Sequence, residues 1–156
     1  MSPQTQPRPV PAVDGFLGVR SGAHGPWARS WTYPATAASV PRCRRAVLKA
    51  LRSHGVLGEA ADSAALLVTE LAGNAVEHAG GRPAGKFTVV LGRRDEWLRI
   101  EVRDGGRPLT LRQRSSAPEV TATAGRGLFL VQALSGSWGV RSTPGGKAVW
   151  CVLGVC

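Results

Sequence analysis

The chain has 156 residues, of which 43% are hydrophobic and 19% charged, and these proportions are typical of one globular domain. Its net charge of +10, mostly from arginine, is compatible with binding to nucleic acid, an acidic protein surface or a polyphosphate, or with a bias toward Arg, Ala and Gly alone. Three cysteines without metal-ligand spacing argue against a disulfide framework and for a reducing compartment. No apolar run approaches the ~20 residues of a membrane helix, and the N-terminus lacks the apolar core of a signal peptide. We therefore expect a cytoplasmic protein without a membrane partner.

The first 29 residues differ in composition from the rest of the chain. They hold five of the eleven prolines and show no periodicity, which predicts a flexible Pro/Gly-rich arm over residues 1–29. Residues 30–156 are expected to form a single domain. Within it, Ser30 to Tyr33 are expected to form a short edge strand that ends at Pro34.

A helix is predicted after this strand, with Ser39 as its N-cap and Pro41 in its first turn. One side of the helix is apolar and carries Val40, Cys43, Val47, Leu48 and Leu51. The other side has a continuous basic stripe, formed by Arg42, Arg45, Lys49 and Arg52. Such a stripe is either a solvated face or a docking surface for an acidic partner.

The next helix, which includes Leu66 to Ala79, has an unusual polar stripe. Its apolar residues recur at helical spacing, at Ala64, Leu67, Leu71 and Ala75. Glu70, Asn74 and His78 are each four residues apart, so their side chains leave one face of the helix. This stripe is either a polar strip between two packed faces or a site in which a carboxylate, a carboxamide and an imidazole act together.

Four strands are predicted in the second half of the chain. The first two form a hairpin, with strands at Lys86–Leu91 and Glu96–Arg103 and a turn at Gly92–Asp95. The last two lie at Trp138–Ser142 and Lys147–Val155, joined by the Pro144–Gly146 turn. The last strand is apolar on both faces, which predicts an interior position in a sheet.

Asp104 follows the second of these strands at a position of buried parity. A carboxylate that points toward a core is costly unless some group donates to it. The Gly105-Gly106 pair after it allows a ligand to approach the backbone closely. The alternative is that the strand has already ended and Asp104 caps a turn.

A second glycine-containing motif lies after an irregular segment. Residues 107–124 lack periodicity and suggest a mobile lid. The Gly125-Arg126-Gly127-Leu128 run then leads into a predicted helix. Exposed N–H groups at a helix N-terminus favour phosphate, although a single Gly-x-Gly is weak evidence by itself.

The order and spacing of these motifs resemble the GHKL ATPase superfamily, which includes gyrase-type ATPases, histidine kinases and bacterial anti-sigma-factor serine kinases. The shared pattern is Glu-x-x-x-Asn on a helix, Asp-x-Gly after a strand, a lid, and Gly-x-Gly-Leu opening a helix. It runs from about Tyr33 to Leu153, and the short chain and short lid are most similar to the anti-sigma-factor kinases. The resemblance implies the Bergerat ATP-binding fold, an α/β (α+β) two-layer sandwich whose mixed sheet is covered on one face by about three helices.

The resemblance also implies roles for individual residues. Glu70 matches the general base of phosphoryl transfer, and Asn74 matches a ligand of Mg²⁺. Asp104 matches the carboxylate that accepts the adenine amino group, and His78 matches a residue of the site wall. The remaining matches are backbone positions that approach the nucleotide and its phosphates, at Gly106, Gly125, Arg126, Gly127 and Leu128.

The chain departs from the family pattern at one place. In much of the family the glycine before the last strand is followed by threonine, but Gly146-Lys147-Ala148 has no hydroxyl. The side chains expected to bind adenine and Mg²⁺ are still present. The missing hydroxyl is a group that, in the family, supports the site near the terminal phosphate.

The function implied by the resemblance is an Mg²⁺–ATP-dependent serine/threonine kinase that binds a sigma factor or phosphorylates an anti-sigma antagonist protein. The nucleotide state would order the lid, and a homodimer is a family-level expectation. The alternative is a nucleotide-gated protein-binding module without efficient kinase activity, which Ala148 favours. Direct nucleic-acid binding is a third reading that rests on the charge alone, because the chain has no recognition motif.

Overall fold

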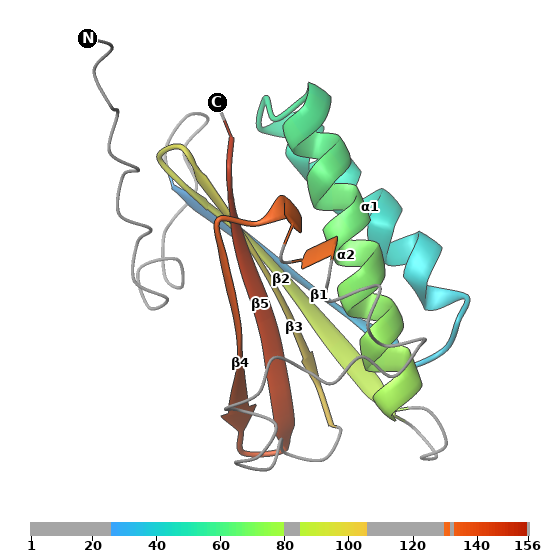
Figure 1. The fold of residues 1–156 in the computed structure, drawn as a ribbon. Coiled ribbons are helices and arrows are strands. Elements are labelled where there is room, and N and C mark those ends of the chain that lie inside the picture. Colours follow the sequence, from blue (N-terminus) through green and yellow to red (C-terminus); the bar gives the residue numbers. More distant parts are fainter. Residues whose placement is uncertain (1–25, 80–84, 106–129, 132, 156) are drawn as a thin grey trace, which may run out of the picture.

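Five strands and two helices make up most of the described part of the chain (Figure 1). The structure is a computed structural model that describes residues 26–79, 85–105, 130–131 and 133–155. The helices are α1 (Ser39–Ser53) and α2 (Gly58–Ala79). The strands are β1 (Trp27–Pro34), β2 (Lys86–Arg94), β3 (Trp97–Asp104), β4 (Ser137–Thr143) and β5 (Gly146–Gly154).

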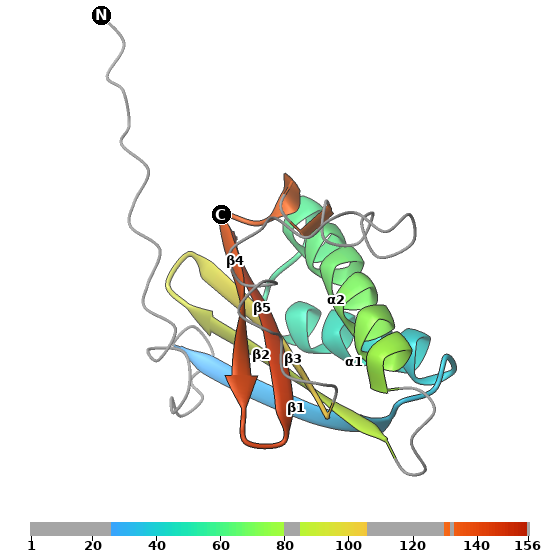
Figure 2. The ribbon, with the colours of Figure 1, turned by 60° about the horizontal axis from the view of Figure 1, so that its bottom comes forward.

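The five strands form one sheet in the order β1-β2-β3-β5-β4. Both helices cover the same face of this sheet, as Figures 1 and 2 show. This arrangement confirms the expected two-layer α+β fold. β5 lies between β3 and β4, and β1 lies at an edge, which confirms the two positions predicted for these strands.

The sheet is antiparallel in all four of its described pairings, so the expectation of a mixed sheet is corrected. Between β1 and β2 the chain passes through two helices in succession. The helix pair returns the chain to the end of the sheet that it left, so β2 runs back along β1. A parallel pair would need a crossover that carries the chain to the opposite end. A third helix was expected after Leu128, and in that segment residues 130–131 and 133–134 are described and helical.

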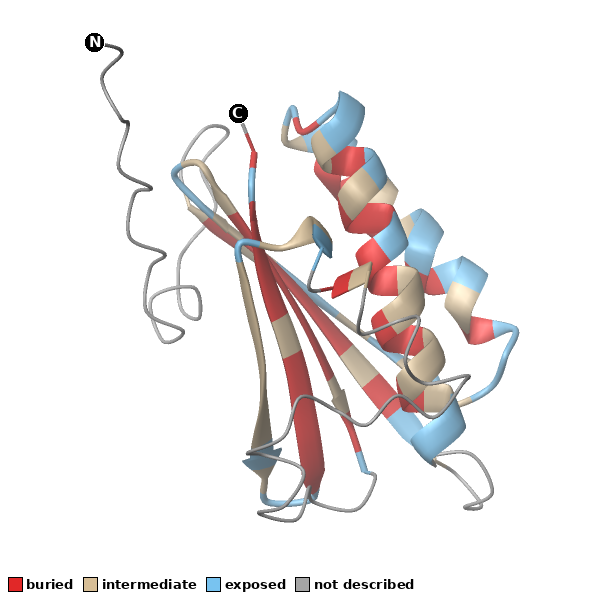
Figure 3. Ribbon diagram, viewed as in Figure 1, coloured by how far each residue is buried: buried red, intermediate tan, exposed pale blue. Residues whose placement is uncertain are grey.

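The core lies between the helices and the sheet (Figure 3). The apolar stripe predicted for α2 faces the strands, because Ala64, Leu67, Leu71 and Ala75 are all fully or almost fully buried. The strands contribute buried side chains to the same core, including Phe87, Leu91, Ile100 and Cys151. Burying one leucine stabilises a fold by about 1.5–3 kcal/mol, so this interlayer core holds α2 firmly over the sheet.

The start of α1 differs from the prediction. The helix begins at Ser39 itself, with Ala38 at the N-cap and no side-chain cap. Ser39 is 1% exposed, and its Oγ lies 3.2 Å from Oγ1 of Thr36. A hydroxyl that has this local partner takes no part in capping the first turn.

The β2–β3 turn is also shorter than predicted. Arg94 pairs with Trp97, so the turn consists of Asp95 and Glu96 rather than Gly92–Asp95. Asp95 adopts the left-handed conformation, with φ at 53°, which Asp tolerates better than most residues. β1 likewise begins at Trp27, within the segment predicted as an arm, and the rest of that arm up to residue 25 lies outside the described residues.

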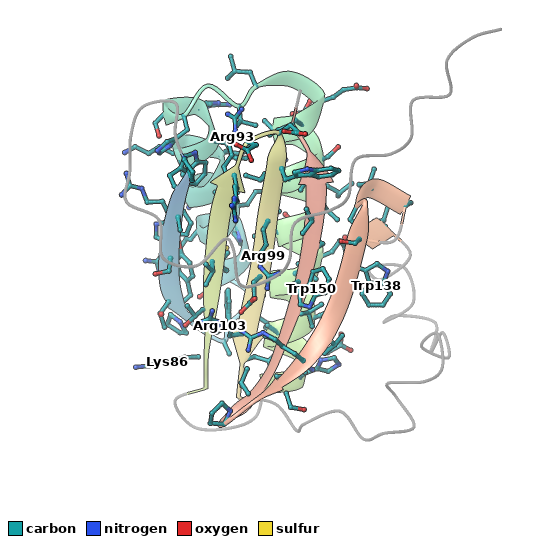
Figure 4. All side chains as sticks on the ribbon, turned by 90° about the vertical axis from the view of Figure 1, so that its left-hand side faces the viewer. Lys86, Arg93, Arg99, Arg103, Trp138 and Trp150 are labelled. Carbon is teal, nitrogen blue, oxygen red and sulfur yellow. The ribbon has the colours of Figure 1, made fainter. Side chains whose placement is uncertain are left out.

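The sheet face turned away from the helices carries a buried ionic cluster (Figure 4). Glu101, on β3, accepts hydrogen bonds from Arg103 Nε and Arg141 Nη2, each at 2.6 Å, and a third from Arg99 Nη2. The Arg99 guanidinium lies over the ring of Trp150, 5.1 Å from its centroid. Burial alone would raise the pKa of Glu101, but the hydrogen bonds from these three arginines hold it below its ordinary value.

Candidate functional site

The polar stripe of α2 lies on the C-terminal half of the helix. Glu70 and Asn74 are half-buried and His78 is exposed. Successive members of the stripe are four residues, or ~6 Å, apart along the axis. Because α2 packs against β2, β3 and β5, the stripe is held on a rigid element near the sheet.

Asp104 is the last residue of β3 and lies on the helix-facing side of the sheet. It follows Leu98, Ile100 and Val102 in the two-residue alternation, and its side chain is 2% exposed. The predicted burial is therefore confirmed, and the carboxylate belongs to the strand rather than to a turn after it. Its partner across the β3–β5 pairing is Lys147.

Lys147 joins α2 to Asp104, and it is the site residue that the sequence reasoning missed. Its Nζ lies 2.6 Å from Nδ1 of His78 and 3.9 Å from Oδ2 of Asp104. When Nζ donates to His78, Nδ1 must carry the lone pair, which places the ring proton on Nε2. Burial lowers the pKa of Lys147, and the Asp104 carboxylate opposes this shift.

A signal for Lys147 was present in the sequence. Lys147 shares the parity of Val149, Cys151 and Leu153 on an interior strand, so its side chain had to face the helices. In the sequence alone this position stands out only as a missing threonine, because a lysine at the start of a strand usually extends into solvent.

Gly146 allows β5 to approach the end of β3. A Cβ at this position would lie 2.0 Å from the carbonyl oxygen of Asp104 and 2.8 Å from Cα of Gly105. Real Cβ atoms do not approach backbone so closely, so any side chain here would push the two strands apart. Gly146, the first residue of β5, therefore allows β5 to pack directly against the backbone of Asp104.

The remaining predicted site residues fall outside the described part of the chain. These are Gly106, Gly125, Arg126, Gly127, Leu128 and the lid over residues 107–124. Within the described residues, no group of three or more His, Cys, Asp and Glu side chains could hold a metal ion. In the same part of the chain, neither helix has the length and apolar character needed to cross a membrane.

A family model for the histidine kinase-like ATPase domain matches residues 33–153, which is most of the chain. The chain belongs to the histidine kinase-like ATPase family. Membership in this family confirms the resemblance on which the site residues were chosen, and it implies nucleotide binding by the domain. A comparison with curated proteins finds no match to this ATPase domain.

Solved structures share the fold of this ATPase domain at low sequence identity. The RsbU and RsbW domains of Rv1364c from Mycobacterium tuberculosis match with a TM-score of 0.62 and 20% identity, over 82% of this chain and 32% of that one. The histidine kinase domain of a blue-light activated histidine kinase from Erythrobacter litoralis matches with a TM-score of 0.51 and 23% identity, over 78% and 61%. The catalytic domain of the histidine kinase ThkA matches with a TM-score of 0.53 and 12% identity, over 81% and 97%. The chain thus spans about a third of the Mycobacterium protein and 61% of the Erythrobacter one.

The described residues fit a purine nucleotide with Mg²⁺. Asp104 is a buried carboxylate at the end of β3, and the amino group of a purine is a donor of the kind that a carboxylate accepts. The amide oxygen of Asn74 is a hard donor of the kind that Mg²⁺ accepts. Mg²⁺ in such sites takes most of its remaining ligands from water and substrate phosphates, so a single protein ligand on α2 is compatible with the ion.

Proposed function

We propose that this domain binds Mg²⁺–ATP and acts as a regulator of the anti-sigma-factor kinase type. It would bind a sigma factor, or phosphorylate an antagonist protein on Ser or Thr. The observation that carries the nucleotide site is the buried carboxylate of Asp104, held at the end of β3 opposite Lys147. The fold shared with a protein that contains an RsbW domain supports the regulatory role. Such a protein would act in the cytoplasm.

Asp104 and Asn74 would bind opposite ends of the nucleotide. Asp104 accepts a hydrogen bond from the base amino group and fixes the base at the end of β3. Asn74, further toward the middle of α2, donates its amide oxygen to Mg²⁺ at the phosphates. An Mg²⁺ ion held by Asn74 would supply positive charge next to the transferring phosphoryl group. The backbone positions at Gly106 and from Gly125 to Leu128 would approach the phosphates.

Glu70 would act as the general base. It lies one helical turn from Asn74 on the same stripe, so a base and a metal ligand face the same phosphoryl group. Glu70 takes the proton of the attacking Ser or Thr hydroxyl as its oxygen bonds to the γ-phosphorus. The bond from phosphorus to the β–γ bridging oxygen breaks, and ADP leaves with the electron pair.

The nucleotide-gated binding module is the alternative function. The residue after Gly146 is Lys147, which contacts His78 and has no hydroxyl group. In this alternative the bound nucleotide changes which protein the domain binds, and no phosphoryl group moves.

The basic stripe on α1 favours a protein partner with an acidic surface. Its basic stripe consists of Arg42, Arg45, Lys49 and Arg52, all exposed. The first turn of α1 carries no acidic residue, and no acid occurs elsewhere in the helix. Opposite charge on a partner would speed association and set its orientation.

Calorimetric titration with ATP, with and without Mg²⁺, tests the proposed site. We expect saturable binding that weakens about 10–100-fold in Asp104→Asn, because a hydrogen bond to a charged group is lost. Asn74→Ala should retain binding but lose its dependence on Mg²⁺. Asp62→Asn, which changes an exposed acid on the same helix α2, serves as the control and should bind as the wild type does. Absence of binding to the wild-type chain would refute the proposal.

A transfer assay separates the two functions. Labelled ATP is supplied together with candidate antagonist proteins, and label on Ser or Thr of the partner supports the kinase. Clear ATP binding with no transfer to any partner, and with Glu70→Gln indistinguishable from wild type, would favour the binding module.

A further inference from the structure

Lys147 is the one lysine of the described residues that is buried. The chain has three lysines, and Lys49 and Lys86 are exposed whereas Lys147 is 5% exposed. Burying an ammonium group is costly unless it meets groups that accept from it. The position of Lys147 therefore needs an explanation beyond the fold, since a threonine or an apolar residue would fill a strand position at lower cost.

The described contacts of Lys147 use only part of its donor capacity. An ammonium group has three N–H donors, and among the described residues it makes one hydrogen bond, to His78. The Nζ–Oδ2 distance of 3.9 Å to Asp104 is too long for a direct hydrogen bond. A donor and an acceptor thus stand side by side on adjacent strands, close enough to contact neighbouring atoms of one ligand edge.

Such a pair matches the polar edge of either purine. Adenine presents an amino donor at C6 beside the acceptor N1, and guanine presents the acceptor O6 beside the N1–H and N2–H₂ donors. In the pose in which the carboxylate accepts from the adenine amino group, guanine would place O6 against a negative oxygen. An ammonium beside the carboxylate gives O6 a donor, while the carboxylate accepts from guanine N1–H.

We propose that Lys147 reads the nucleobase and allows this site to hold guanine nucleotides as well as adenine nucleotides. The inference rests on the nucleotide site proposed above, with Asp104 at the base. Two features make the pair suitable for reading a base. Both residues lie on paired strands, which hold their backbones at fixed spacing, and His78 orients the lysine from the opposite layer.

Titrations with ADP, GDP and inosine diphosphate test this proposal without phosphoryl transfer. In the wild-type chain, GDP should bind within about tenfold of ADP. In Lys147→Met, which keeps the length of the side chain and removes its donors, GDP should weaken at least about tenfold more than ADP, as expected for one lost base contact. Inosine diphosphate has O6 and N1–H but no N2 amino group, so it should follow GDP if O6 is the atom that Lys147 contacts.

Two further variants control the measurement. Lys86→Met removes the same charge from an exposed lysine and should leave the ratio of the GDP and ADP affinities unchanged. Lys147→Thr restores a hydroxyl and should bind ADP while rejecting GDP. Circular dichroism of each variant checks that the fold is retained.

The failures of the two proposals are distinguishable. ADP binding in the wild type together with GDP more than about a hundredfold weaker would overturn the role of Lys147 and leave the ATP site intact. An equal loss of ADP and GDP in Lys147→Met would show that the lysine only supports the fold, and would overturn it too. If neither nucleotide binds the wild type, both the site and the base-reading role are refuted.

Discussion

Glu101 is a buried carboxylate that forms ion pairs with three arginines. Two of them, Arg99 and Arg103, are labelled in Figure 4 on the sheet face away from the helices. Its side chain is fully buried, whereas Arg103 and Arg141 are partly exposed. Removing one partner from a buried ion pair leaves an uncompensated charge, which costs about 3–5 kcal/mol. We expect Glu101→Gln to lose that much free energy of unfolding in urea at pH 7. Glu77→Gln changes an exposed acid on α2 and should unfold as the wild type does.

The same carboxylate gives a pH dependence with a definite sign. The folded state holds the pKa of Glu101 below its ordinary value of 4.5, so the unfolded chain binds the proton more tightly. The stabilisation is complete above pH 4.5 and is lost as the pH falls through the folded-state pKa. The stability difference between wild type and Glu101→Gln should therefore shrink in acid. A difference that stays constant between pH 7 and pH 3 would contradict this account.

Single positions in the site were partly predictable from the sequence. The burial of Asp104 followed from strand alternation, and Glu70, Asn74 and His78 fell on one stripe because helical spacing is regular. The contact between His78 and Lys147 could not be predicted in this way, because the two residues are 69 positions apart and lie in different layers. Periodicity describes the face of an element, and only packing decides which faces meet.

At the scale of the elements, the close approach of β5 to β3 depends on Gly146. We expect Gly146→Ala to cost at least about 1–3 kcal/mol, as overpacking does, because its Cβ would overlap the carbonyl oxygen of Asp104. It should also abolish ATP binding, since the carboxylate would move with its strand. Gly145→Ala is the matched control, because a Cβ there meets nothing within 4 Å. Equal unfolding midpoints for the two alanine variants would contradict the prediction.

The elements were predictable where hydrophobic periodicity is strong, as it is along α2 and β3. Their ends were not, because the ends depend on local hydrogen bonds that compete with one another. Ser39 looked like a cap, but the helix begins one residue earlier than that role requires. Gly92 suggested an earlier start for the turn, but it lies within β2 and pairs with Arg99. The turn itself is Asp95-Glu96.

At the scale of the whole molecule, the net charge of +10 leads to a prediction about salt. Binding to DNA should be weak and non-specific, because it would arise from released counterions alone. It should fall by several orders of magnitude between about 50 mM and 200 mM salt. An electrophoretic shift series measures this, and ATP binding should persist over the same range. A tight complex with one DNA sequence at 200 mM salt would instead support the nucleic-acid-binding reading.

The direction of the strands is also a property of the whole molecule. The motifs indicate the family and the two layers. They do not indicate how many helices connect β1 to β2. That connection makes β1 and β2 antiparallel, and the direction of these two strands is decided by chain topology rather than by any residue at the site.

The interior position of β5 has a consequence for biosynthesis. β5 is the last described strand along the chain, yet β3 and β4 both pair with it. On a ribosome that adds about 5–20 residues per second, β4 waits about 0.5–2 s and β3 about 2.5–10 s for the stretch that ends at Gly154. During that interval β3 has an open edge, and open edges pair readily with other chains. The nascent protein is therefore most exposed to aggregation just before Lys147 meets Asp104, so its yield in cells should depend on how quickly this final stretch is translated.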